Sequence, residues 1–169
     1  FMKKLLKLAL ASFAILSFSA NADGMLNSYS SMRIDTTASR VWDVVKDFDG
    51  LDIWHPVFSG ADIKSGNNNE VGAIRTLTIQ DGPSFDEELL AWDALNRTYT
   101  YRVIDPAPLP IKNYSSTVTV MQLAPGVADI TWTSSYQNGS NGEMSDEEVI
   151  AFLNGAYKAG LEQVKAMVK

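Results

Sequence analysis

Three side chains in this sequence have the chemistry for proton transfer or for anchoring a polar group: His55, Arg75 and Glu87. His55 is the only histidine, and the pKa of an imidazole suits proton transfer near neutral pH. It precedes Pro56, which favours an extended loop backbone, so a turn residue stacked on Trp54 is the alternative role. One histidine and no cysteine leave no multi-histidine or thiolate metal site, and we predict neither a metal nor a cofactor.

Arg75 and Glu87 lie on two segments that alternate as strands do, 71–79 and 84–92. A three-residue hairpin loop with Gly82 in the left-handed conformation would place Arg75 directly opposite Glu87. Two opposite charges would then meet on an otherwise apolar face of the sheet. Such a pair could orient a carbonyl or carboxylate group, act in acid–base catalysis, or form a silent buried ion pair.

The same faces, and those of the later strands, combine aromatic walls with a few hydroxyl groups. This mixture is usual in the lining of a pocket for a mostly apolar small molecule. The alternative for the tyrosines and the tryptophan is an ordinary hydrophobic core. The strand residues predicted to line the pocket, besides the charged pair, are Leu77, Phe85, Tyr99, Tyr101, Tyr114, Ser116 and Trp132.

An α+β fold positions these residues, because a series of strands shares the chain with one short and one long helix. The short helix is predicted over 38–48 with Thr37 as its cap. The long helix is predicted over about 146–168, and Ser145 with Glu148 gives it a capping box. The predicted strands cover residues 28–35, 57–64, 71–79, 84–92, 98–104, 114–123 and 128–136.

The long helix carries small residues in its apolar stripe, at Ala156 and Gly160, one turn apart below Phe152. A helix that fills a core tightly rarely leaves two such gaps. We therefore predict a ligand cavity between this helix and the sheet, with Phe152, Ala156 and Gly160 facing it.

Several short motifs follow one another along the chain: 35–42, 47–51 (DFDGL), 54–56 (WHP), 71–75 (VGAIR), 108–110 (PLP) with 113–114 (NY), and 160–162 (GLE). Together they resemble the SRPBCC superfamily, also called START or Bet v 1-like. The most similar branch is the polyketide cyclase/dehydrase-like one, whose exported bacterial members include accessory proteins of periplasmic methanol oxidation. The resemblance implies the helix-grip fold: a seven-stranded antiparallel sheet wrapped around a long C-terminal helix, with two short helices after the first strand and a cavity inside.

Plant abscisic acid receptors are distant members of this superfamily, and the resemblance puts His55 where they have a cavity lysine. It also implies a gate loop at 81–84 and a latch loop at 109–111, with Leu109 and Ile111 against the ligand. The lysine and the His–Arg pair of the latch are missing from this sequence, so binding of that hormone is not implied.

The first 22 residues have the parts of a secretory signal: three lysines, an apolar run over 8–18 and an Ala-Asn-Ala cleavage site before Asp23. The apolar run of 11 residues is shorter than the roughly 20 that span a bilayer. This length favours a cleaved signal over the alternative, a retained membrane anchor. We predict a signal peptide over 1–22 and a single domain over 23–169, exported to the periplasm of a Gram-negative bacterium with no stable membrane insertion.

Removal of the signal would leave 11 basic and 20 acidic residues, a net charge of −9. Such a surface repels nucleic acid and anionic headgroups, so we predict no nucleic-acid partner. The predicted function is binding of a small hydrophobic or amphipathic ligand, of lipid, polyketide or aromatic type, in the cavity. Two alternatives stay open: a cofactor-independent cyclase, dehydrase or lyase with Arg75, Glu87 and His55 as catalytic residues, and a protein partner role as accessory to a periplasmic dehydrogenase.

Overall fold

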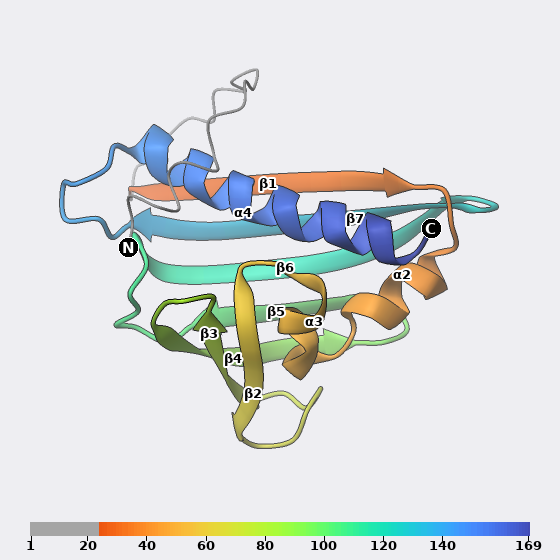
Figure 1. Ribbon diagram of the computed structural model, residues 1–169, viewed down its shortest axis with the longest axis horizontal. Helices are drawn as coiled ribbons and strands as arrows, with labels where there is room; N and C mark the ends of the chain where they lie inside the picture. Colours follow the sequence, from red (N-terminus) through yellow and green to blue (C-terminus); the bar gives the residue numbers. More distant parts are fainter. Residues whose placement is uncertain (1–23) are drawn as a thin grey trace.

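The computed structural model describes residues 24–169 and shows a seven-stranded antiparallel sheet curved around a long C-terminal helix (Figure 1). The strands lie in the order β1-β7-β6-β5-β4-β3-β2, so the first strand pairs with the last and hairpins join the other neighbours. The strands are β1 (Met25–Ile34), β2 (Phe58–Ser65), β3 (Ile74–Ile79), β4 (Ser84–Asp93), β5 (Thr98–Val103), β6 (Ile111–Ala124) and β7 (Val127–Asn138). This arrangement confirms the predicted helix-grip fold of the α+β class.

The C-terminal helix α4 (Asp146–Met167) runs along the sheet, and the short helices α2 (Ala38–Val45) and α3 (Leu51–Trp54) lie on the same side of it (Figure 1). The predicted capping box is present: the Ser145 hydroxyl accepts a hydrogen bond from the Glu148 amide at 3.2 Å, and the Glu148 carboxylate accepts one from the Ser145 amide at 2.8 Å. The buried residues of α4 are Val149, Leu153, Tyr157, Gly160, Leu161 and Val164. No helix within residues 24–169 is long and apolar enough to cross a membrane.

The connection between β1 and β2 differs from the single helix predicted over 38–48, because α2 ends at Val45. A short 3-10 turn, η2 (Phe48–Gly50), follows it and leads into α3. The side chains of Asn69 and Asn68, from the turn after β2, accept hydrogen bonds from the first two backbone amides of η2 at 2.9 and 3.1 Å. These bonds satisfy the free amides of a new helical start, which explains the two short helices that the resemblance implied.

The predicted register of the β3–β4 hairpin is confirmed, since Arg75 pairs with Glu87 across the two strands. The turn itself differs from the prediction. Asp81 has the left-handed conformation, with a φ of 53°, and the amide of Gly82 donates to the carbonyl of Ile79 at 2.9 Å. Aspartate tolerates this conformation because its short side chain can bond to nearby backbone. The register depends on the length of the loop, so it is unaffected by which loop residue has the positive φ.

A β-bulge in β4 changes which of its side chains face the core. The pairing with β5 shifts register between Leu89 and Ala91, and a bulge of this kind reverses the inward–outward alternation. Ala91, which strict alternation would place inside with Leu89, is therefore exposed. Trp92 turns toward the core instead, where its indole N–H donates to the Lys46 carbonyl at 2.9 Å.

Candidate ligand-binding site

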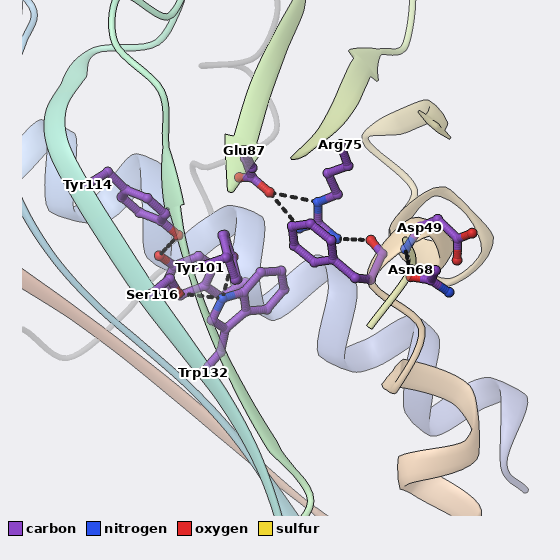
Figure 2. A network of polar contacts seen from close by, with 10 residues as sticks. Asp49, Asn68, Arg75, Glu87, Tyr101, Tyr114, Ser116 and Trp132 are labelled. Carbon is purple, nitrogen blue, oxygen red and sulfur yellow. Dashed lines mark hydrogen bonds and ion pairs between the residues drawn. The ribbon is translucent and has the colours of Figure 1, made fainter. Parts of the chain in front are cut away.

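The predicted pair of charges lies inside the protein, where Arg75 is 1% and Glu87 4% exposed. The Nε and Nη2 groups of Arg75 donate to the same Glu87 oxygen, Oε2, at 2.9 and 2.5 Å (Figure 2). Nη1 of Arg75 donates to the carbonyl of Phe48. The guanidinium carbon lies 4.1 Å from the centre of the Phe48 ring and 5.1 Å from that of Tyr101. One carboxylate, one carbonyl and two aromatic faces therefore surround this cation.

Burial and pairing act in opposite directions on the titration of these two groups. Loss of water raises the pKa of Glu87, and the Arg75 charge opposes that rise. Loss of water alone would lower the pKa of Arg75, but the Glu87 carboxylate raises it above its ordinary value. A guanidinium that donates two N–H groups to one carboxylate stabilises the ionised form of both, so the pair as a whole carries no net charge.

A line of hydrogen-bonded side chains crosses the interior beside this pair (Figure 2). The indole N–H of Trp132, on β7, donates to the Ser116 hydroxyl at 2.8 Å and to the Tyr101 hydroxyl at 3.1 Å. Ser116 in turn donates to the carbonyl of Thr133 at 2.7 Å. Because the ring of Tyr101 also faces the guanidinium of Arg75, this residue joins the line to the charged pair.

Two tyrosines extend the polar groups of the interior to α4. The hydroxyls of Tyr114 and Tyr157 lie 2.6 Å apart, and Tyr157 donates to the Ser134 hydroxyl at 2.6 Å. Since a phenol has one proton, Tyr114 is the donor in its bond with Tyr157. Burial raises the pKa of Tyr101, Tyr114 and Tyr157, so all three hydroxyls stay protonated near neutral pH.

His55 joins the segment before β2 to the C-terminal helix, and it is 2% exposed. Its Nδ1 accepts a hydrogen bond from the Val57 amide at 3.3 Å, so Nε2 carries the proton and donates to the Ala156 carbonyl at 3.0 Å. Burial lowers the pKa of His55 to about 4. The imidazole is therefore neutral near pH 7 with both nitrogens bonded to backbone, an arrangement that suits a structural contact better than proton transfer to a ligand.

The gap predicted beside Gly160 is filled by protein, while Ala156, predicted to face the same gap, is half-buried. A Cβ atom placed on Gly160 would lie 2.6 Å from Cδ2 of His55 and 3.2 Å from the ring of Trp132. Tyr157, on the same helix, stacks on Trp132 with ring centres 4.5 Å apart and 14° between the ring planes. The absence of a side chain at Gly160 thus makes room for His55 and Trp132, and the expectation of an open groove at this place is wrong.

A recess of about 310 Å³ opens at the end of the sheet, where the β3–β4 turn meets the β5–β6 loop. Its walls are Thr76, Ser84, Phe85, Asp86, Ile104, Asp105 and Pro106. Phe85 is shared between the recess and the core: it is 7% exposed, its ring lies 6.2 Å from that of Phe58, and the next inward residue on its strand is Glu87. The recess residues Thr76, Ser84 and Asp86 lie at outward positions of the same hairpin. The volume is at the lower end of the range for small-molecule sites.

The other residues predicted to line the pocket divide between the core and the loops. Leu77 and Tyr99 are buried on inward strand faces, and Ile111 is buried where β6 begins. Leu109 and Phe152 are half-buried and pack against the core. The latch residues Leu109 and Ile111 are not walls of the recess, whose loop walls come from earlier in the β5–β6 connection. Within residues 24–169, no group of three or more potential metal ligands lies together.

Two features of the interior were not predicted. The Phe48 carbonyl, which accepts from Arg75, has no signal in the sequence, because residue type does not report where a carbonyl points. Trp54 is fully buried, and its indole N–H has no hydrogen-bond partner in the described part of the chain. Its ring lies 5.4 Å from that of Trp132, as well as 6.0 Å from the expected neighbour His55. A tryptophan in an apolar turn could have indicated a buried donor in need of a partner, because a buried N–H needs an acceptor.

Comparison with known proteins agrees with this fold and with the superfamily suggested by the motifs. The family described as "Polyketide cyclase / dehydrase and lipid transport" matches residues 25–169. None of the curated proteins compared with the chain matches it.

Many solved structures share this fold, and three of them serve as examples. An uncharacterised protein from Bacillus thuringiensis is 27% identical, with a TM-score of 0.75, over 85% of this chain and 98% of that one. The protein XoxI from Bacillus cereus is 28% identical, with a TM-score of 0.74, over 83% and 94% of the two chains. A protein from Nitrosospira multiformis, 22% identical over 85% and 97% of the chains with a TM-score of 0.71, supports the fold alone.

Proposed function

We propose, because the chain belongs to the polyketide cyclase / dehydrase and lipid transport family, that it binds one small hydrophobic or amphipathic molecule between the sheet and α4. The observation that carries the proposal is a set of polar groups within an aromatic interior. Phe85 is a wall of the surface recess, and Glu87 is the next inward-facing residue on the same strand. Glu87 in turn pairs with Arg75 on β3. Small-molecule sites combine largely apolar walls with a few placed polar groups in this way.

Binding requires the protein to open, since side chains occupy its interior. Half-buried side chains lie close to the recess: the ring of Phe58 is 6.2 Å from that of Phe85, and Leu109 belongs to the same connection as the recess residues Asp105 and Pro106. We propose that the ligand enters here and displaces the ring of Phe85. Burial of about 300 Å² of apolar ligand surface would contribute roughly 7 kcal/mol, enough to offset the movement of one aromatic side chain.

Native mass spectrometry of the protein purified without denaturation tests this proposal. We expect a small molecule that leaves on denaturation or, if the host supplies none, a one-to-one complex with the neutral fluorophore N-phenyl-1-naphthylamine that raises the melting temperature. The control is Glu88→Gln, a change beside Glu87 on the outer face of β4, where Glu88 pairs with Arg102; it should bind equally well. A protein that carries no extra mass and shows no saturable probe binding would contradict the proposal.

The enzymatic alternative needs a side chain that can exchange a proton with the ligand. Both nitrogens of His55 are bonded to backbone, and Oε2 of Glu87 accepts two bonds from Arg75. These contacts favour binding over turnover. The alternative role, as an accessory protein of a periplasmic dehydrogenase, stays a prediction.

We also propose that the protein acts in the periplasm as a single domain over 23–169, on the basis of residues 1–22, which lie outside the described residues. Expression of the full chain in a Gram-negative host, followed by cell fractionation and mass measurement, tests this. A periplasmic protein that begins at Asp23 is the expected product. A cytoplasmic protein that keeps residues 1–22 would contradict export.

A further inference from the structure

We infer that the ligand of this site is an uncharged molecule with a hydroxyl or carbonyl oxygen, rather than a carboxylate, phosphate or sulfonate. This inference rests on the proposed function and narrows its ligand class. The charge balance of the interior, the bonding of its polar groups and the charge of the recess all favour such a ligand.

The charge of the interior is already balanced by the protein. Two nitrogens of Arg75 donate to Glu87 and the third donates to the Phe48 carbonyl. An entering carboxylate would either displace Glu87, leaving it buried without a partner, or add a second negative charge beside one cation. Both outcomes are strongly unfavourable away from water, whereas an uncharged oxygen needs no counter-charge.

The other polar groups of the interior are uncharged, and among residues 24–169 the indole N–H of Trp54 lacks a partner. The hydroxyls of Tyr101, Tyr114 and Tyr157 are bonded to one another or to neighbouring side chains, and both nitrogens of His55 are bonded to backbone. Trp54 is fully buried, and no acceptor for its indole N–H lies in the described part of the chain. A ligand hydroxyl or carbonyl beside this indole would satisfy it and remove the free-energy cost of an unpaired buried donor.

The recess itself disfavours anions. Two of its walls are the carboxylates Asp86 and Asp105, and the second accepts a bond from the amide of Asn113 at 2.9 Å. Asp86 accepts a hydrogen bond from Lys64 at 2.5 Å and another from the Thr76 hydroxyl at 2.7 Å. These bonds lower the pKa of Asp86, so it stays ionised. Two carboxylates against one lysine leave the recess negative, in a chain whose net charge is −6.

Two fluorescent probes with the same aromatic skeleton measure this charge preference. N-phenyl-1-naphthylamine is neutral, and 8-anilino-1-naphthalenesulfonate carries one negative charge. We expect the wild-type protein to bind the neutral probe about tenfold more tightly, or better. Glu87→Gln leaves the Arg75 charge without its counter-ion and should reduce that ratio about tenfold. Glu88→Gln, the same change on the outer face, should leave the ratio as it is.

The outcomes separate this inference from the proposed function. Equal or tighter binding of the sulfonate by the wild-type protein, or an unchanged ratio in a folded Glu87→Gln variant, would overturn the inference and leave a binding site. Lack of saturable binding of both probes would overturn the proposed function and the inference with it.

If Glu87→Gln loses cooperative thermal unfolding, the salt dependence of probe binding by the wild-type protein replaces this variant as the test. Repulsion by the recess requires that added salt strengthens sulfonate binding and not neutral-probe binding, and a sulfonate affinity that does not rise would overturn the inference.

Discussion

The imidazole of His55 occupies the space that a side chain at Gly160 would need, with Cδ2 2.6 Å from the position of the missing Cβ. Nε2 of the same ring donates to the carbonyl of Ala156. Residues 156 and 160 are four apart and share one face of α4, so His55 contacts the helix over a full turn. The glycine is therefore a requirement of this contact between the α3–β2 segment and the C-terminal helix.

Gly160→Ala should destabilise the protein by about 1–3 kcal/mol, because the added methyl group overpacks a filled site. In a His55→Ala background the same change should cost much less, because only the 3.2 Å contact with the Trp132 ring remains and alanine is the better helix former. Urea unfolding of the four proteins of this double-mutant cycle measures the coupling. Equal effects of Gly160→Ala in both backgrounds would show that the two residues are independent.

The stability should fall in acid in a way that depends on His55. The unfolded chain takes up a proton near the ordinary pKa of 6.5, whereas burial lowers the pKa of the folded residue to about 4. The contribution of the neutral ring is therefore complete above pH 6.5 and decreases as the pH falls toward 4, by up to roughly 3 kcal/mol.

His55→Phe removes this titration and serves as the reference for it. The unfolding free energy of wild type minus that of His55→Phe should decrease as the pH is lowered from about 7 to about 4.5. Denaturant unfolding at several pH values measures it, and the comparison cancels the titration of other groups. A difference that stays constant across the range would refute a depressed pKa for His55.

Arg75→Met should destabilise the protein by about 3–5 kcal/mol, because Glu87 would remain buried without a partner. Arg75→Met/Glu87→Met removes both charges and should recover most of that loss. The matched control is Arg102→Met/Glu88→Met, an ion pair on the outer face whose arginine side chain is 56% exposed; it should cost less than about 1 kcal/mol. Urea unfolding gives all these values, and a double variant less stable than Arg75→Met would contradict the role assigned to the pair.

Phe85→Ala should accelerate the association of N-phenyl-1-naphthylamine, because it removes the buried ring that the proposed entry of the ligand must displace. It should also reduce stability by about 2–4 kcal/mol, as expected for a largely buried phenylalanine. Leu90→Ala, on the exposed face of the same strand, should change neither quantity much. Stopped-flow fluorescence measures the association rate, and equal rates in the three proteins would mean that the ligand enters elsewhere.

The β3–β4 hairpin shows why much of the fold could be predicted from the sequence. Alternation set which side chains face inward and loop length set the register, so the pairing of Arg75 with Glu87 followed even though Asp81, not Gly82, has the positive φ. Both signals are local. The bulge that exposes Ala91 has no comparable local signal and was missed.

The filled interior could not be predicted, because it depends on contacts between distant parts of the chain. The small residues of α4 indicated free space, and only the fold brings His55 into it. That the Trp54 indole finds no acceptor among the described residues is likewise a property of its assembled neighbours. Which residues face inward was thus accessible from the sequence, while what each of them touches was not.

The hydrogen bonds that Asn68 and Asn69 accept from the backbone amides of η2 connect a surface turn to the centre of the protein. The carbonyl of Phe48, at the start of η2, is one of the groups that orient the guanidinium of Arg75. The position of a buried cation is therefore set partly by a turn at the periphery. Sequence changes in that turn can adjust the polarity available to a ligand without altering any residue that touches it.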